Sequence, residues 1–240
     1  MVTSEKRQGD TVETFIFIWS DLASIAAMTV QHIEIVGVGI GLAILTGVPL
    51  GILITGNAGL AKVVLYTAAM VMTIPSVALF GLMIPVLSVI GQGIGFLPTV
   101  IALFLYAQLP IVRNTYTAIT NIDPALREAA KAMGMKTGER LRKVELPIAL
   151  PIIMAGVRMA VVINVGVAAI AAYIGAGGLG KLISRGISQS DPRQLIAGAI
   201  LISVLAIAAD FGLGCLQRLL TPKGLRPTPW LAGFRKYRPS

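Results

Sequence analysis

Long apolar blocks separated by short polar stretches make up most of this chain. Several blocks exceed the roughly 20 residues that an α-helix needs to cross a hydrocarbon core of about 30 Å. They lack the alternation of apolar and polar residues that membrane β-barrel strands show. The pattern therefore predicts an all-α, polytopic transmembrane bundle with five core spans, which we place at residues 34–55, 60–90, 96–112, 148–172 and 194–216.

The second block, residues 60–90, is too long for one straight span. As a single helix it would extend about 46 Å, whereas two halves of about 14 residues would each be too short to cross. We therefore expect one span that is bent at Pro75 or Pro85, because proline interrupts a helix.

The segment "FIFIWSDLASIAAMTV", residues 15–30, allows two interpretations. It could be a sixth span, or an amphipathic helix that lies on the membrane surface. Asp21 near its middle would be costly inside the hydrocarbon core, which favours the interfacial helix. The resulting domain division is an N-terminal segment at 1–33, a transmembrane domain at 34–220 and a basic tail at 221–240.

Composition agrees with a membrane protein. Of 240 residues, 55% are hydrophobic and 13% charged, and the mean hydropathy is +0.83, outside the balance of soluble domains. The net charge of +9 could indicate nucleic-acid binding, but the basic residues are divided unequally between the two sides of the predicted membrane spans. Fourteen fall on one side, namely Lys62, those from Arg113 to Lys143 and those from Arg218 to Arg238, and five on the other. Since basic residues accumulate in cytoplasmic loops, the sequence predicts a cytoplasmic 113–147 loop and C-terminus, an outside N-terminus, and no nucleic-acid partner.

The 113–147 loop carries signals for two short helices. Asp123 and Pro124 are a strong helix start, since the carboxylate can cap free N–H groups and proline suits the first helical position. Gly134 occupies the place where a helix ends in a left-handed residue. We expect Thr137 to cap a second helix and Pro147 to mark the return to the membrane.

The first of these helices has a smooth face of small and apolar residues, at Leu126, Ala129, Ala130 and Met133. Small side chains let another protein approach closely, so the face could dock a partner. The alternative is a juxtamembrane linker that anionic lipid attracts through its positive charge.

The loop resembles the EAA motif in the permease subunits of ABC importers. That motif is Glu-Ala-Ala, three residues, Gly, nine residues, Ile, one residue and Leu-Pro. Every fixed position matches except the isoleucine, for which this chain has valine: Glu128, Ala129, Ala130, Gly134, Val144, Leu146 and Pro147. Over about 200 residues, stretches such as "TIPSVALFGLMIPVL", "LPIVRNT" and "IGAGGLG" are similar to the permeases for glycine betaine, carnitine, choline and related quaternary-amine osmolytes.

The resemblance implies a type I importer fold and several partners. These are two ABC ATPase subunits, a second permease subunit that is the same or a related chain, an extracytoplasmic substrate-binding protein, and membrane lipid. It implies that this chain binds no cofactor, because ATP and magnesium belong to the ATPases. It also assigns Glu128, Ala129, Ala130 and Gly134, flanked by Arg127 and Lys131, to an ATPase-coupling element on the cytoplasmic face of a multi-pass protein of the inner cell membrane.

Two further patterns suggest chemistry that their context does not support. "GAGGLGKL", residues 175–182, resembles a nucleotide-binding loop, but Leu182 replaces the required hydroxyl and no strand precedes it. His32 and Glu34 are too few ligands for a metal site. Cys215 lies within an apolar segment, where a small packed residue is expected.

Charged and aromatic residues inside the spans give candidate internal sites. Arg158 and Asp210 should form an ion pair between the last two spans, because an unpaired charge there is costly; it could be a transport gate or a static fastener. A quaternary ammonium is held by aromatic faces, so the candidates for the substrate pathway are Phe80, Phe104, Tyr106 and Tyr173, with Asn164 as a polar one.

The predicted function is ATP-driven import of an osmolyte by a subunit that is not itself an enzyme. Three alternatives remain from sequence: an importer of amino acids or another small solute, a stand-alone secondary carrier or channel, and a membrane enzyme. The last lacks a recognisable catalytic arrangement. Which osmolyte is carried stays open.

Overall fold

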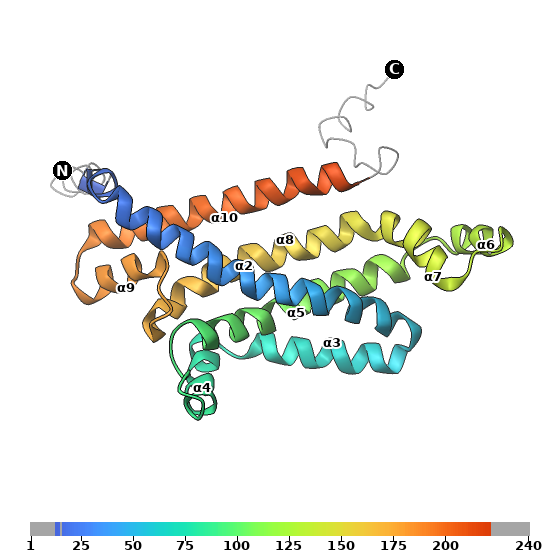
Figure 1. Ribbon diagram of the computed structural model, residues 1–240, viewed down its shortest axis with the longest axis horizontal. Coiled ribbons are helices and arrows are strands. Elements are labelled where there is room, and N and C mark those ends of the chain that lie inside the picture. Colours follow the sequence, from blue (N-terminus) through green and yellow to red (C-terminus); the bar gives the residue numbers. More distant parts are fainter. Residues whose placement is uncertain (1–12, 15, 222–240) are drawn as a thin grey trace, which may run out of the picture.

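The computed structural model describes residues 13–14 and 16–221, and within these ranges the regular structure is entirely helical. Four long helices run side by side along the molecule: α2 (Leu22–Leu53), α5 (Phe96–Thr120), α8 (Leu146–Ile170) and α10 (Pro192–Leu220). The shorter α6 (Pro124–Ala132) and α7 (Thr137–Arg140) project from one end of the bundle, and α9 (Gly180–Ser188) lies at the other (Figure 1). Predicted features within residues 1–12 and 222–240, including most of the basic tail, lie outside the described residues.

The first span begins earlier than predicted. Residues 16–20 are helical, Asp21 forms a turn, and α2 then continues without a break from Leu22 to Leu53. The predicted boundary at residue 34 is therefore wrong, and residues 22–33 form neither a separate interfacial helix nor a sixth span. No glycine or proline interrupts the helix between Leu22 and Val36, which explains its continuity.

The second block is broken at Pro75. Helix α3 (Ala58–Thr73) and helix α4 (Ser76–Ser88) meet at an angle of 98°. Ile74, which precedes the proline, is extended with ψ of 125°, as the proline ring requires. The predicted bend at Pro75 is confirmed, whereas Pro85 lies inside α4 without ending it. The bend is much sharper than the kink expected within one span, and α4 turns away from the bundle (Figure 1).

The two helices predicted in the polar loop are present, but the second has different ends. Thr137 is the first residue of α7 and forms no side-chain cap, since Lys136 occupies the cap position. Helix α7 passes through a five-residue π-helical turn, Leu141–Glu145, directly into α8. Helix α8 begins at Leu146, where the sequence predicts the return to the membrane at Pro147, and a proline in the first turn of a helix displaces no hydrogen bond.

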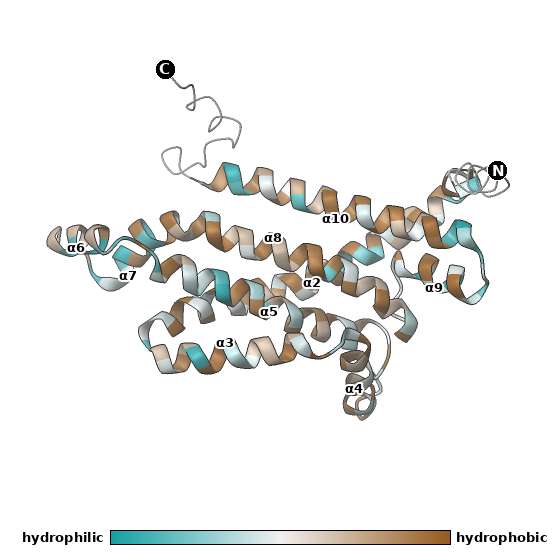
Figure 2. Ribbon diagram, turned by 180° about the vertical axis from the view of Figure 1, so that it is seen from behind, coloured by the Kyte–Doolittle hydropathy of each residue, from teal (hydrophilic) through white to brown (hydrophobic). Residues whose placement is uncertain are grey.

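Helix α5 is the centre of the bundle. It packs against α2, α3, α4 and α8, while α10 packs against α8 and α9. The main core contains Ile35, Phe80, Leu103 and Ile111, all at most 1% exposed. Hydrophilic residues concentrate at the two ends of the bundle, and apolar ones along α2, α8 and α10 (Figure 2). Four helices are long and apolar enough to cross a membrane, and the α3–α4 pair adds a fifth candidate, which agrees with the five predicted core spans.

Candidate functional site

Helix α6 is built as a rigid projection from the bundle. At its start, the backbone N–H of Ala125 donates to Asp123 Oδ1 at 2.9 Å. At its end, Gly134 has a φ of +79° and the N–H of Met135 donates to the carbonyl of Ala130 at 3.2 Å. These contacts satisfy free backbone groups at both ends of the helix. The predicted start and stop signals therefore define α6.

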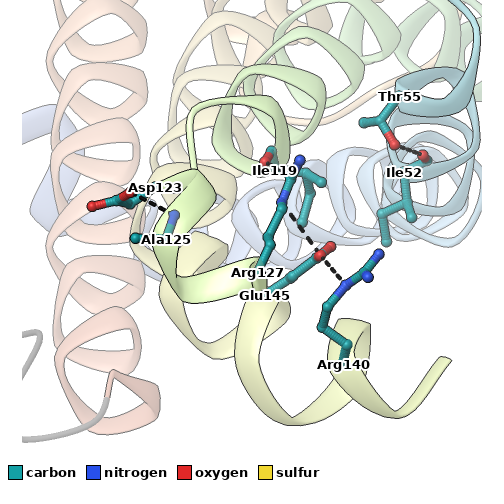
Figure 3. Close-up of polar contacts among 8 residues, drawn as sticks. All are labelled: Ile52, Thr55, Ile119, Asp123, Ala125, Arg127, Arg140 and Glu145. Carbon is teal, nitrogen blue, oxygen red and sulfur yellow. Dashed lines mark hydrogen bonds and ion pairs between the residues drawn. The ribbon is translucent and has the colours of Figure 1, made fainter. Parts of the chain in front are cut away.

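A buried carboxylate fixes α6 against the start of α8. Glu145, in the π-helical turn, is 5% exposed and lies between two guanidinium groups (Figure 3). Arg140 Nε donates to Glu145 Oε1 at 2.8 Å, and Arg127 Nε lies 3.4 Å from the same oxygen. Arg127 also donates to the carbonyl of Ile119, the last turn of α5. One side chain of α6 is thus tied to both α5 and the turn before α8.

The six residues predicted to couple to a partner divide into two groups. Arg127 turns inward to Glu145, and Ala130 is buried at 1% exposure. Glu128, Ala129, Lys131 and Gly134 are exposed, beside Leu126 and Met133, which are 45% and 69% exposed. The bundle therefore holds one side of α6 and leaves an apolar and charged side uncovered. Sequence reasoning missed Glu145 and Arg140; the available signal was a carboxylate placed directly before Leu-Pro in a stretch rich in basic residues.

Arg158 and Asp210 meet between α8 and α10. Arg158 Nε donates to Asp210 Oδ1 at 2.8 Å and Arg158 Nη2 donates to Asp210 Oδ2 at 2.7 Å. This is the two-point geometry that suits guanidinium and carboxylate groups. Gln217, which sequence reasoning missed, accepts from Arg158 Nη1 at 3.2 Å and donates to the carbonyl of Pro151 at 3.1 Å. The interaction therefore links three polar side chains and the α8 backbone.

The five candidates for a substrate pathway lie in different surroundings. Phe80 and Tyr106 are buried in the core, where the Tyr106 hydroxyl donates to the carbonyl of Ile74 at the α3–α4 break. Phe104 lines a groove of about 390 Å³ between α2, α3 and α5. Asn164 is fully buried in α8 and Tyr173 is 56% exposed. The structure brings Phe80 and Tyr106 into one core cluster, with Phe104 packed against it, while the Asn164 side chain donates to the carbonyl of Ala160 within α8.

The glycine-rich loop after α8 is held by α2. Gly175, Gly177 and Gly178 have positive φ. Gln31 Nε2 donates to the carbonyl of Ala176 at 3.2 Å, and the N–H of Gly178 donates to Gln31 Oε1 at 3.0 Å. A loop that cradled phosphate would need such N–H groups free, so this one is a structural turn. Gln31 carried no signal in sequence.

His32 follows Gln31 and packs beneath the same loop. Its Nε2 lies 3.1 Å from the carbonyl of Val165, and the ring is 1% exposed. Within the described ranges, no three His, Cys, Asp or Glu side chains come together in a way that could hold a metal ion. His32 therefore serves as a packed contact between α2 and α8.

Comparison with known proteins places this geometry in a family. Residues 47–223 match the model of the family described as "binding-protein-dependent transport system inner membrane component". The osmoprotectant import permease protein OsmW of Salmonella typhimurium is 55% identical over 215 residues, which are 90% of this chain and 100% of that relative. The glycine betaine/carnitine/choline transport system permease protein OpuCB of Bacillus subtilis is 45% identical over 134 residues, or 56% of this chain and 62% of that relative.

A solved structure shares the arrangement of helices. The MetNI methionine ABC transporter in an inward-facing conformation has a chain that matches with a TM-score of 0.75 and 26% identity, covering 82% of this chain and 96% of that one. The predicted all-α type I importer fold is thereby confirmed. The chain belongs to the family of inner membrane components of binding-protein-dependent transport systems, and it is a multi-pass permease subunit of the ABC importer type.

Proposed function

We propose that this permease carries a quaternary-amine osmolyte into the cytoplasm, with glycine betaine, carnitine and choline as the candidate substrates. The observation that carries the proposal is the 55% identity to an osmoprotectant import permease over that relative's entire length. A second relative that is named for all three substrates supports the same chemical class.

The proposed complex contains two ATPase subunits, a second permease that is identical or related, and an extracytoplasmic substrate-binding protein. The ATPases would bind ATP and magnesium, and their hydrolysis of ATP would drive transport, so this chain needs no cofactor of its own. The proposed contact with an ATPase is the exposed side of α6, with Glu128, Ala129, Lys131 and Gly134. Arg127 and Ala130 hold that helix to the bundle and act through its position.

We propose that α6 and the C-terminal end of α10 face the cytoplasm. Both lie at the same end of the bundle (Figure 1), and among the described residues the loop at 113–143 alone carries more basic residues than the segment 181–193 near the α9 end. The α9 end would then face the binding protein.

The pathway itself is proposed to form between two permease subunits. The five predicted pathway residues range from buried to exposed within one chain, and α10 leaves much of its apolar surface uncovered. Aromatic side chains can hold a passing quaternary ammonium only weakly when they are dispersed, which suits a transport pathway. In this arrangement Arg158 and Asp210 fasten α8 to α10, and a gating role would require the pair to separate during transport.

Uptake by the complex reconstituted in liposomes tests the proposal. Labelled glycine betaine, carnitine and choline are each supplied with the binding protein outside and ATP inside. We expect ATP-dependent accumulation of at least one of them and none with a non-hydrolysable ATP analogue. No uptake of any of the three would overturn the substrate assignment.

Two alternatives are separated by the same assay. The similarity to a methionine transporter favours an amino-acid importer as the second candidate, which predicts ATP-dependent uptake of labelled methionine instead. A stand-alone carrier predicts uptake by the purified chain without ATPase subunits.

A further inference from the structure

Two basic residues border the longest uncharged stretch of the chain. Between Lys62 and Arg113 there are fifty residues, 63–112, without a single Asp, Glu, Lys or Arg. The stretch leaves the membrane surface on α3, turns at the far end through α4, and returns on α5. Lys62 and Arg113 therefore mark the same face of the membrane, where the hydrocarbon region ends.

The structure brings both residues into one cleft. The cleft lies between α3 and α5 and has a volume of about 430 Å³. Its polar lining residues are Lys62, Tyr66, Arg113 and Tyr116. The other lining residues are three alanines and one leucine, with no acidic side chain among them. Within the described part of the chain, neither Lys62 nor Arg113 takes part in an ion pair. Two cationic side chains thus face one cleft, lined largely by small side chains, without an acidic partner.

We propose that this cleft binds the phosphate headgroup of an acidic phospholipid from the leaflet on the α6 side. Guanidinium and ammonium groups are the side chains that bind phosphate oxygens best, and basic pockets between transmembrane helices are typical headgroup sites. The Tyr66 and Tyr116 hydroxyls can donate to the same phosphate or its glycerol. The alanines Ala58, Ala61 and Ala69 leave room for the headgroup to approach α3.

The position of the cleft favours a lipid over the transported solute. The separate groove that Phe104 lines is on another side of α3, where Thr46 and Leu50 of α2 face it. If the proposed function holds, choline has a net positive charge, which two unpaired cations repel, while glycine betaine and carnitine are zwitterions that lack the net negative charge of an acidic phospholipid. An acidic phospholipid has the opposite charge and is anchored at the depth where Lys62 and Arg113 lie.

The test measures binding of phosphatidylglycerol to the full chain in nanodiscs of phosphatidylcholine. The variant Lys62→Gln/Arg113→Gln removes both cations. The control Lys181→Gln/Arg185→Gln removes two positive charges from α9 at the opposite end of the bundle. Each basic side chain near a membrane surface strengthens attraction of an acidic lipid about fivefold, so we expect affinity to fall about 30-fold in the first variant and less than about twofold in the control.

Additional arms identify the source of the bound group. Inorganic phosphate should not displace phosphatidylglycerol, because only the lipid gains from burying its chains beside α3. The charge-preserving variant Lys62→Arg/Arg113→Lys should retain binding, which separates loss of charge from loss of fold. Equal weakening in the two double variants, displacement by inorganic phosphate, or displacement by glycine betaine would each overturn the proposal. Since no readout involves uptake, the result is independent of whether the osmolyte assignment holds.

Discussion

Replacing Glu145 by glutamine should loosen α6 from the bundle. Glutamine keeps the size of the side chain and an acceptor for Arg140, but it removes the negative charge that faces Arg127 and Arg140. The two guanidinium groups would then lie close together without a counter-charge. The substitution therefore tests whether charge at this buried position holds the helix that we propose as the ATPase contact.

The expected loss follows from how buried the group is. Removing one partner of a fully buried ion pair costs about 3–5 kcal/mol, while exposed pairs contribute at most about 1 kcal/mol. The Glu145 side chain is 7% exposed, but those of Arg127 and Arg140 are 32% and 16% exposed, so water screens part of the loss. We therefore expect docking of α6 to weaken by about 2 kcal/mol, or about 30-fold.

Hydrogen exchange of the α6 amides measures this docking. A nine-residue helix is not stable alone in water, so its amides exchange when it leaves the bundle. Exchange should accelerate about 30-fold in Glu145→Gln. The matched control is Glu139→Gln, which breaks an exposed pair with Lys143 at 2.7 Å and should change the rate less than about threefold. Equal rates in the two variants would refute the reasoning.

Two further substitutions test other contacts. Neutralising Arg158 should destabilise the chain by about 3 kcal/mol, since Asp210 is then left unpaired between two membrane helices. Uptake and protein yield should fall when the charge of either Arg158 or Asp210 is reversed, and both should return when the two charges are reversed together. A double reversal that is no better than the worse single reversal would exclude the pairing. Gly178→Ala should lower stability by about 2 kcal/mol, because the residue has a φ of +69° and its new Cβ would lie 2.8 Å from His32 Nδ1. Thermal unfolding in detergent compares it with Gly166→Ala, where nothing lies within 4 Å; equal melting temperatures would contradict this account of the loop.

Sequence predicts the parts of this fold that local chemistry decides. The uncharged apolar blocks predict the number of spans, Asp123 with Pro124 predicts the start of α6, and Gly134 predicts its end. Each of these signals acts within a few residues along the chain. The EAA pattern adds the family because its spacing is long and specific.

The errors arise where distant segments decide the outcome. The sequence predicts Asp21 inside a helix, whereas a turn places it before α2. Thr137 is predicted to cap the second loop helix, whereas Lys136 occupies the cap position and a π-helical turn carries the chain into α8. The roles of Gln31 and Glu145 depend on partners that only the tertiary structure brings near, since Gln31 contacts a loop about 145 residues away. No local pattern could have revealed the partner of Gln31, and for Glu145 the local signal was only its position among basic residues.

The most direct test of the central claim is photocrosslinking of the assembled importer from α6. A photoreactive residue at position 129, on the exposed side of α6, should crosslink to an ATPase subunit. One at position 187, where Ile187 is 55% exposed on α9, should crosslink to no ATPase, because it lies at the opposite end of the bundle. Crosslinks to the ATPase from position 187, or none from position 129, would contradict both the coupling site and the orientation of the chain.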